Sequence, residues 1–384
     1  MTNDTLLCYQ KSIELLKKNS TEFGILASSP SVRAKERNYL SIFGRDASIC
    51  ALGMISSADK KLMHIAKNSL KTLADNQAAN GQIPTFVKPE EKRVDFWRMG
   101  TTDSTLWWLI AMDNLKKNNE TAFVKKFAKN IDKALIFLRA WEHPTFSLLV
   151  QLEASDWADL MPRSGYVLNN NALWCKVKEI YNLPGKEKSH EYFSYLFDAK
   201  TKIPNKIKKE NIRFAHFVES AERDKNINAL VSFVKRYESG NEVDVFANCL
   251  AFLSGAITEK RAKQIFKYFI ANSANEPISV KTVLRPIKPN SKQWEKYMAD
   301  HHQNYPYKYH NGGVWPFISA FWVIALHDAG FKKIAQNELE KLAKLNLKSG
   351  FNEWFHGQTG RAMGKKGQSW NAAMYILAYN TINK

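Results

Sequence analysis

Apolar residues recur at helical spacing along most of the 384-residue chain, and this periodicity constrains the fold more than any other feature. Alternating apolar and polar runs, which would predict strands, are short and lie mostly beside Pro or Gly. The chain is therefore expected to be all-α, with about a dozen helices, the number that six helical hairpins need. The helical pattern covers residues 7–16, 49–55, 63–73, 106–115, 123–138, 172–180, 227–237, 245–257, 260–269, 315–327, 331–345 and 369–379.

No stretch rich in Pro, Gly or Ser divides the chain into segments that could fold separately. The composition is that of an ordinary globular protein, with 45% hydrophobic and 24% charged residues. The length alone would favour two or three domains, but a closed ring of helical hairpins reaches this size as one unit. We therefore expect residues 1–384 to form a single domain.

The cysteines and histidines predict neither a metal site nor a disulfide framework. Cys8, Cys50, Cys175 and Cys249 lie far apart without a CxxC pair, and the nine histidines show no HxH or HxxxH spacing. We expect no metal and no cofactor, and the cysteine usage fits a reducing cytoplasm. The N-terminus lacks the pattern of a signal peptide, and no apolar run predicts a membrane span.

A net charge of +19 is the one unusual feature of the composition. A nucleic acid, a membrane surface or an anionic substrate could each be attracted by such a charge. The lysines, however, occur as scattered pairs on polar helix faces, without a compact basic run or an RNA-binding aromatic motif. This distribution predicts a solvated surface, with neither nucleic acid nor membrane as partner, and it leaves a homo-oligomer open.

Five loops are unusually rich in aromatic, acidic and glycine residues, and each precedes or follows a predicted helix. Their sequences are FGRDAS, FWRMGTTDSTLWW, LEASDWADLMPRSGYVLNNN, KYHNGGVWP and FNEWFHGQTG. A ring of hairpins would place such loops on one rim, where they can converge on a pocket. The sequence contains no GxSxG, GxxxxGK[ST], HExxH or GxGxxG motif, so the common hydrolase, nucleotide and zinc signatures are absent.

The residue types in these loops are those that cleavage of a glycosidic bond requires. One carboxylic acid must protonate the leaving oxygen while a second carboxylate attacks the sugar or activates water. Aromatic rings stack on sugar faces, and polar side chains hydrogen-bond to hydroxyl groups. The loops offer as candidates Phe43, Arg45, Asp46, Trp97, Arg98, Asp103, Asp156, Trp157, Asp159, Arg163, His310, Asn311, Trp315, Glu353, His356, Gln358 and Trp370.

In their order along the chain, these loops resemble those of six-hairpin glycosidases, the group of alkaline and neutral invertases, trehalases and processing α-glucosidases. The segment TTDSTLWWLIAMDNL is similar to an invertase segment in which Asp and Ser precede a Leu-Trp-Trp helix. HNGGVWPFISAFW is close to the family's helix start, and FNEWFHGQTGRAMGKKGQSW resembles its closing block. The resemblance spans most of the chain and implies an (α/α)6 toroid with glycosidase activity.

The resemblance also implies which carboxylates react. The family's general acid is a mid-chain aspartate often followed four residues later by arginine, which matches Asp159 and Arg163; its base is a glutamate before the last helix, which matches Glu353. Such enzymes invert the anomeric configuration, and Asp46 would hold the sugar with Arg45 orienting it. A protonated Asp159 would need a raised pKa, from Trp157 and the charge of Asp156.

Several assignments stay open at this stage. Two aspartates stand where the trehalase-like pattern has one, so Asp156 is the first alternative acid and Asp103 the second. Any single carboxylate could instead cap a helix, and His310 or His356 could be purely structural. At least one of Trp107 and Trp108 should pack in the core, because adjacent helix positions cannot both face one pocket.

The reading that combines these features is a cytoplasmic, inverting α-glycosidase acting on a small α-glucoside, with sucrose as the leading substrate. Trehalose, glucosylglycerate or an α-1,6 linkage are alternatives within the same activity. A glycoside phosphorylase, in which phosphate replaces the attacking water, is a second enzymatic alternative. The non-enzymatic alternative is a helical scaffold that binds carbohydrate or nucleic acid.

Overall fold

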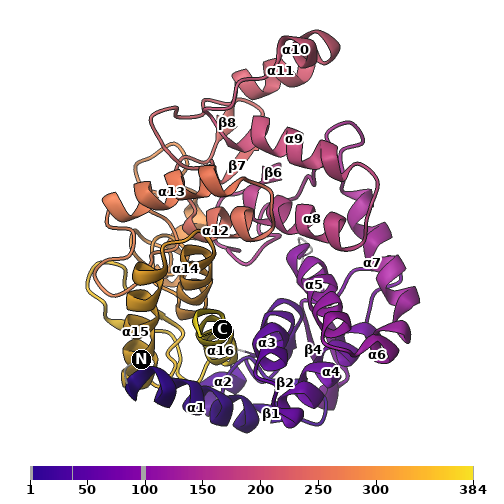
Figure 1. Ribbon diagram of the computed structural model, residues 1–384, viewed down its shortest axis with the longest axis vertical. Coiled ribbons are helices and arrows are strands. Elements are labelled where there is room, and N and C mark those ends of the chain that lie inside the picture. The colour runs from indigo at the N-terminus through magenta and orange to yellow at the C-terminus, as the bar shows by residue number, and fades with distance from the viewer. Residues whose placement is uncertain (1–2, 37, 97–100, 384) are drawn as a thin grey trace.

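The computed structural model describes residues 3–36, 38–96 and 101–383, and within these ranges sixteen α-helices account for most of the secondary structure. Twelve of them alternate along the chain between an inner and an outer ring (Figure 1). This is the predicted all-α (α/α)6 toroid. The six inner helices are α3 (Gly44–Ser56), α5 (Asp103–Lys117), α8 (Leu168–Ile180), α12 (Val245–Leu253), α14 (Pro316–Asp328) and α16 (Ser369–Ile382).

The outer helices each cover an inner one, and their sequences show the difference between the two layers. In α4, the buried positions follow the one-sided spacing of an amphipathic helix, whereas α14 is buried without interruption from Pro316 to Leu326. A helix that is apolar all round must be enclosed by protein, as the inner ring is. The outer helices are α1 (Asn3–Lys18), α4 (Lys60–Asp75), α7 (Ala128–Ala140), α9 (Lys186–Phe197), α13 (Glu259–Ala271) and α15 (Lys332–Ser349).

The inner ring closes where the first inner helix meets the last. Each inner helix packs on the next, and α16 packs on α3. Gly53 makes the closest approach at this seam, because a Cβ there would lie 1.9 Å from the Ala373 carbonyl oxygen. Outside the seam, α1 packs on α15 and α16, and the Tyr375 hydroxyl donates a hydrogen bond to the Thr5 carbonyl at 3.0 Å.

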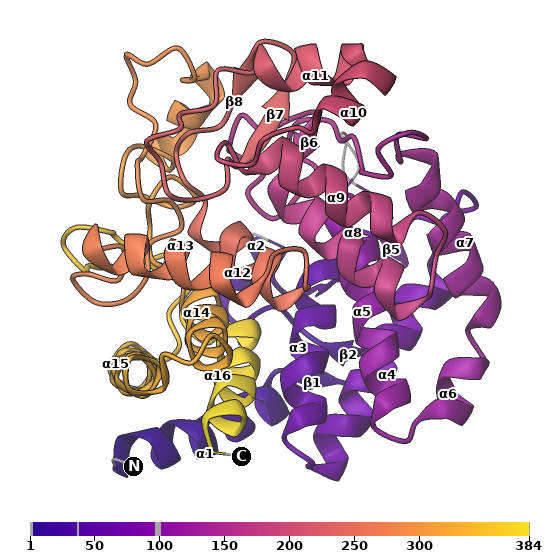
Figure 2. The ribbon, with the colours of Figure 1, turned by 45° about the horizontal axis from the view of Figure 1, so that its top comes forward.

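Four small antiparallel sheets, four short α-helices and two 3₁₀-helices, Pro89–Glu91 and Lys296–His302, complete the described fold. The strands are β1 (Ser20–Thr21) with β2 (Gly24–Ile25); β3 (Ile42–Phe43), β4 (Phe86–Lys88) and β5 (Arg93–Asp95); β6 (Tyr166–Val167), β7 (Phe233–Lys235) and β8 (Glu238–Ser239); and β9 (Trp354–Phe355) with β10 (Ala362–Met363). The short α-helices are α2 (Val32–Glu36), α6 (Thr121–Lys125), α10 (Asn205–Glu210) and α11 (Ile212–Glu219). Helices α10 and α11 project beyond β7 and β8 at one end of the molecule (Figure 2).

Several segments differ from the helices expected from periodicity, and among them the short helices α2, α10 and α11 were not predicted. Residues 227–237 were predicted to be helical and instead lead into the hairpin β7–β8, where Tyr237 adopts a positive φ of 61° at the turn. The prediction was wrong because Phe-Val with a following turn favours a strand over a helix. The pattern at 123–138 is interrupted between α6 and α7, and α9 was not predicted.

The described residues contain no helix that is long and apolar enough to cross a membrane. All four cysteines are buried free thiols. Within the same residues, no group of three or more His, Cys, Asp or Glu side chains is arranged to hold a metal ion.

Candidate active site

The N-terminal ends of the inner helices other than α12, and the loops that lead into them, enclose a cavity of about 250 Å³. All five loops that the sequence marked as rich in aromatic and acidic residues contribute side chains to this cavity, although they are distant from one another in the sequence. Helix N-termini carry a partial positive charge from the peptide dipoles, which favours carboxylates nearby. The residues that line the cavity are Asn38, Tyr39, Phe43, Arg45, Asp46, Thr85, Phe86, Thr101, Asp156, Trp157, Asp159, Tyr309, His310, Trp315, Glu353, Gln368 and Trp370.

Glu353 lies in the segment between α15 and β9 and is held on both of its carboxylate oxygens. The Tyr39 hydroxyl donates to Oε1 at 2.7 Å, and the Lys365 backbone N–H donates to Oε2 at 3.1 Å. The Glu353 N–H in turn donates to the Lys365 carbonyl at 2.6 Å. Hydrogen bonds from two donors stabilise the ionised form of a carboxyl group, so this arrangement favours a carboxylate.

Asp159 lies at the edge of the cavity in the loop before β6, with 42% of its side-chain surface accessible. A ligand can therefore reach the carboxyl group directly. The surrounding walls nevertheless displace much of its water, and this desolvation raises the pKa of Asp159 to about 6. The Arg45 guanidinium opposes the rise in pKa, while the charge of Asp156 adds to it.

His310 lies beside this carboxyl group, with Nδ1 3.8 Å from Asp159 Oδ1. The imidazole is almost completely buried, and Nδ1 has no hydrogen-bond partner among the described residues. Burial holds the pKa of His310 well below its usual value, and the nearby charges of Arg45 and Arg163 lower it further. A neutral imidazole adds no positive charge beside Asp159, so Arg45 is the cation that favours its ionised form.

Two further aspartates pair with Arg45 at the start of α3, and a third, Asp156, lines the same cavity. The guanidinium Nη1 donates to Asp103 Oδ2 at 2.9 Å, and Nε lies 3.6 Å from Asp46 Oδ2. Asp156, completely buried, accepts a hydrogen bond from the Ala158 N–H at 2.8 Å, and burial raises its pKa. Asp46 and Asp156 line the cavity. Asp103 does not line it and instead holds the Arg45 guanidinium through their hydrogen bond.

Aromatic side chains form most of the remaining wall. Trp315 and Trp370 meet edge to face with ring centroids 5.7 Å apart, and Trp157 meets Trp315 in the same manner at 5.7 Å. Phe43 pairs with Phe86 across the β3–β4 register. Rings fixed in this way offer rigid apolar faces on which a sugar ring can stack. Trp107 and Trp108, in contrast, both belong to the core.

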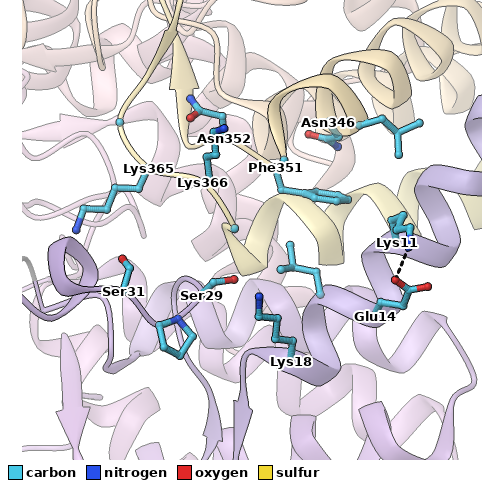
Figure 3. Close-up of a pocket in the computed structure, with 16 residues that line it drawn as sticks. Lys11, Glu14, Lys18, Ser29, Ser31, Asn346, Phe351, Asn352, Lys365 and Lys366 are labelled. Atoms are coloured by element: carbon cyan, nitrogen blue, oxygen red, sulfur yellow. Dashed lines mark hydrogen bonds and ion pairs between the residues drawn. The ribbon is translucent and has the colours of Figure 1, made fainter.

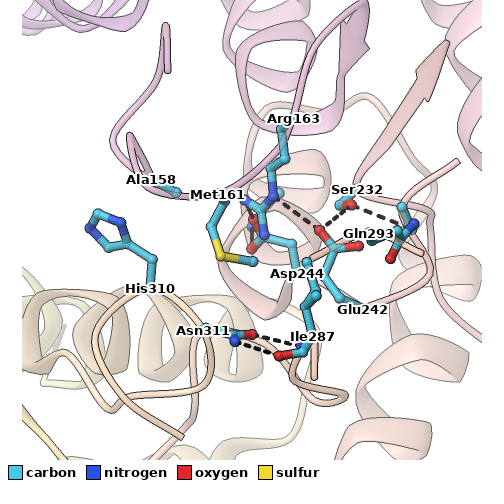
Figure 4. Close-up of polar contacts among 12 residues, drawn as sticks. Ala158, Met161, Arg163, Ser232, Glu242, Asp244, Ile287, Gln293, His310 and Asn311 are labelled. Carbon is cyan, nitrogen blue, oxygen red and sulfur yellow. Dashed lines mark hydrogen bonds and ion pairs between the residues drawn. The ribbon is translucent and has the colours of Figure 1, made fainter. Parts of the chain in front are cut away.

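The structure places Arg163 and Asn311 away from the cavity, where protein groups satisfy them (Figure 4). Buried Arg163 donates to Glu242 Oε1 at 3.0 Å and forms a short ion pair with Asp244. Asn311 exchanges two hydrogen bonds of 2.8 Å with the backbone of Ile287. Direct contact with substrate, predicted for both residues, does not fit these positions, because their polar groups are already used in holding the surrounding loops together.

Two other predicted binding residues belong to the β9–β10 turn rather than to the cavity. His356 Nδ1 accepts hydrogen bonds from the N–H groups of Gln358 and Thr359, and the Gln358 side chain is exposed. Their predicted contact with a sugar therefore does not fit their positions either. Trp97 and Arg98, also predicted to bind substrate, lie outside the described residues.

Several residues that line the cavity were not among the sequence candidates. Tyr39 is the most consequential, because its hydroxyl holds Glu353. Gln368 caps α16 and lines the cavity two residues before Trp370, so the Gln-x-Trp pattern in the closing segment did carry a signal for it. No comparable signal marks Asn38, Thr85, Phe86, Thr101 or Tyr309.

The described cavity thus combines an accessible carboxyl group whose pKa is raised to about 6 with a second carboxyl group that accepts hydrogen bonds from two donors. These are the two partners of general acid–base catalysis. The aromatic walls and the Arg45–Asp46 pair supply surfaces and hydrogen-bonding groups for a polyhydroxylated ligand.

Residues 242–384 match the family model described as alkaline and neutral invertase. A probable alkaline/neutral invertase of Arabidopsis thaliana is 30% identical over 136 residues, which are 34% of this chain and 27% of that relative. The chain thus matches about a quarter of that relative's length. The predicted resemblance to invertases is confirmed in this C-terminal part.

Solved structures are similar over nearly the whole chain. A mannosylglycerate hydrolase from Thermus thermophilus, solved with glucose, has a TM-score of 0.64 and 17% identity, covering 96% of this chain and 99% of that one. A bacterial glucoamylase solved with acarbose has a TM-score of 0.60 and 14% identity, covering 98% of this chain and 55% of that one. At these identities the similarity concerns the fold, and it confirms the predicted six-hairpin toroid.

Proposed function

We propose that this protein is a glycoside hydrolase that cleaves a small α-glucoside with inversion, using Asp159 as the general acid and Glu353 as the general base. The observation that carries the proposal is that both carboxyl groups line one cavity in different electrostatic surroundings. The pKa of Asp159 is raised to about 6, whereas hydrogen bonds from Tyr39 and Lys365 favour the ionised form of Glu353.

In the proposed reaction, Asp159 transfers its proton to the glycosidic oxygen as the bond to the anomeric carbon breaks. Glu353 accepts a proton from a water molecule that attacks the opposite face of that carbon. The α-linked substrate then yields a β-configured product. Asp46, oriented by Arg45, would accept hydrogen bonds from the hydroxyls of the reacting sugar, and Trp157, Trp315 and Trp370 would enclose its ring.

Sucrose is the proposed substrate, and two features support it. The invertase match covers residues 242–384, which supply Tyr309, His310, Trp315, Glu353, Gln368 and Trp370 to the cavity. The cavity volume of about 250 Å³ lies below the range of drug-sized ligand sites, about 300–1,000 Å³, and fits a small sugar. The described lining also holds four carboxyl groups and one guanidinium, which favours a neutral aglycone.

A glycoside with an anionic aglycone is the second candidate. The similarity to mannosylglycerate hydrolase extends over 96% of this chain, and the net charge of +19 would attract an anion. Glucosylglycerate and mannosylglycerate therefore belong beside sucrose in any assay. For the location, the four free thiols support our proposal of a reducing compartment such as the cytoplasm.

The test is to incubate the protein with sucrose, trehalose, isomaltose, glucosylglycerate and mannosylglycerate, with and without phosphate, and to follow the released anomer by NMR. Sucrose should yield β-glucose first, without any need for phosphate. Asp159→Asn and Glu353→Gln should each lower kcat by about 10²–10⁴-fold, the usual contribution of general acid–base groups. Asp156→Asn tests the alternative acid in the same assay.

Each result separates the alternatives. Activity that requires phosphate would identify a phosphorylase, and release of the α-anomer would contradict inversion. Full activity in both Asp159→Asn and Glu353→Gln would refute the assignment of the two carboxylates. If no glycoside is cleaved, the proposed function is wrong, and retention of carbohydrate binding by Asp159→Asn would then identify a binding protein.

A further inference from the structure

A second cavity, larger than the one described above, lies behind the segment that carries Glu353 (Figure 3). It is a groove of about 790 Å³ between α1, the segment 29–31 that leads into α2, the end of α15 and the loop 364–367. We call it the lysine groove, after the four lysines among its lining residues, Lys11, Lys18, Lys365 and Lys366. None of the four lysine side chains takes part in the catalytic reaction proposed above.

The charge of the lysine groove is strongly unbalanced. Glu14 is the single acidic residue among its described lining residues, and its carboxylate is paired with Lys11 at 2.7 Å. Lys18 and Lys366 are exposed and have no acidic partner in the described part of the chain. Both lysines line the groove, and their uncompensated positive charge would be reduced by a bound anion.

Neutral polar groups complete the lining on the side of α2. Ser31 Oγ accepts a hydrogen bond from the Ala34 N–H at 3.1 Å, which leaves the hydroxyl proton available to a ligand. Figure 3 shows Ser31 and Lys18 across the groove from the loop 364–367. Hydroxyl and ammonium donors around one concave space are suited to the several acceptor oxygens of a phosphate group.

The loop 364–367 is a wall shared by the lysine groove and the catalytic cavity. On one side, Lys366 lines the groove; on the other, the Lys365 backbone makes both hydrogen bonds to Glu353. Gly364 packs so closely that a Cβ there would lie 2.5 Å from Glu353 Oε2. The Lys365 ammonium also lies 4.8 Å from the ring of Tyr39, the other donor to Glu353.

We propose that the lysine groove binds a small phosphorylated molecule and that its occupation fixes the loop 364–367, which raises the activity of Glu353. A phosphorylated molecule that contacts both Lys18 on α1 and Lys366 on the loop would tie these two elements together. The loop then holds Glu353 more firmly through the Lys365 backbone. Binding is independent of the proposed function, whereas the gain in activity rests on it.

Calorimetric titration of the intact protein tests binding, with inorganic phosphate and glucose 6-phosphate as probes and glucose as the uncharged control. We expect saturable binding of both phosphates, weakened at higher ionic strength, and none of glucose in the groove. The double variant Lys18→Gln/Lys366→Gln should bind at least tenfold more weakly. Lys129→Gln/Lys344→Gln is the matched control, because it removes two exposed lysines from α7 and α15 outside the groove.

Backbone hydrogen exchange tests the coupling without any need for activity. Glucose 6-phosphate should slow exchange of the amides of Glu353, Gly367 and Gln368 at least threefold, and only when Lys18 and Lys366 are present. In the same conditions kcat should rise at least twofold. Neither Lys18 nor Lys366 belongs to the catalytic machinery, so the double variant should keep the kcat of the unliganded protein.

Two outcomes would overturn the inference, and a third would overturn the proposed function. Absence of phosphate binding, or binding that the double variant retains, refutes the groove as the site. Binding that leaves both exchange and kcat unchanged refutes the coupling to Glu353. A protein that binds phosphate and slows exchange but cleaves no glycoside refutes the proposed function instead, so the two failures are distinguishable.

Discussion

At the scale of single residues, Asp159 and Glu353 carry the same functional group but differ in their surroundings in the cavity. Asp159 loses hydration and has a neutral imidazole beside it, because burial holds the pKa of His310 well below its usual value. Glu353 receives hydrogen bonds from Tyr39 and Lys365. Two groups of the same kind are thereby prepared for opposite roles, as a proton donor and a proton acceptor.

The raised pKa of Asp159, about 6, has a direct consequence for the pH dependence of the reaction. A general acid must be protonated, and its protonated fraction falls as pH rises through the pKa. We therefore expect kcat/KM to decline above about pH 6, approaching a tenfold loss per pH unit. The measurement is a profile of kcat/KM between about pH 5 and pH 8 with the glycoside that proves to be cleaved.

Asp156→Asn provides the control for this profile, because removal of its charge eliminates one contribution that raises the pKa of Asp159. The alkaline limb should then move to lower pH while the reaction persists. If the limb disappears with Asp156→Asn and survives in Asp159→Asn, Asp156 is the acid.

At the scale of elements, a buried ion cluster connects the loop of Asp159 to the start of α12. Arg163 bonds to Glu242 and to Asp244, and Asp244 also caps α12 through the Ala247 N–H (Figure 4). Arg163→Met should lower the free energy of unfolding by about 3–5 kcal/mol, because two buried carboxylates lose their counter-charge. Urea unfolding of both proteins measures this difference.

The same variant distinguishes a structural role from substrate binding. Because Arg163 does not line the cavity, the folded fraction of Arg163→Met should keep KM within about threefold of the wild type. Arg213→Met is the matched control: Arg213 is exposed on α11, and its loss should change stability by no more than about 0.5 kcal/mol. A large rise in KM without a loss of stability would show that Arg163 binds substrate.

The loop 364–367 offers a second prediction at this scale. Gly364 has a φ of +76°, and an added Cβ would lie 2.5 Å from Glu353 Oε2. Gly364→Ala should therefore displace the carboxylate and lower kcat at least tenfold, beyond the backbone cost of about 1 kcal/mol. Steady-state kinetics and denaturant unfolding of the same sample measure the two effects.

Gly350→Ala is the control that isolates the backbone cost. Gly350 has a similar φ of +68° at the end of α15, but its added Cβ would meet nothing closer than the Lys366 side chain at 3.7 Å. It should lose stability by a comparable amount and keep its kcat. Equal kcat for the two variants would show that Gly364 does not position Glu353.

These elements also show how far local sequence could predict the site. The helical class was expected from periodicity, which is a local signal, whereas the roles of Asp159 and Glu353 were expected from the resemblance of their loops to those of six-hairpin glycosidases. Arg163 and Asn311 carried the right chemistry, yet their partners Glu242 and Ile287 are set by packing between distant segments. Tyr39 was missed for the same reason, since its partner Glu353 lies 314 positions away.

At the scale of the whole molecule, the integrity of the cavity depends on closure of the helical ring. The carboxyl groups come from loops before different inner helices, so the cavity exists only while the ring is closed. Closure depends on contacts between the two ends of the chain, at Gly53 with Ala373 and at Thr5 with Tyr375. We therefore propose that residues 1–384 unfold as one cooperative unit.

The four cysteines can test this proposal, because they are distributed around the ring in α1, α3, α8 and α12. All are buried, and desolvation raises the pKa of Cys8 and of Cys175 to about 12, so the reactive thiolate is scarce in the native state. A thiol reagent should modify Cys8, Cys50, Cys175 and Cys249 at similar denaturant concentrations, in step with loss of helicity.

Mass spectrometry of the labelled peptides resolves the four sites, and their order of modification decides between two structural models. If the ring is one unit, opening any seam exposes every inner helix, and the four labelling transitions coincide. Early modification of Cys8 alone would mean that α1 separates first and that α15 and α16 keep the ring closed without it. Separate transitions for Cys50 and Cys249 would contradict a single unit, because α3 and α12 would then belong to parts that unfold independently.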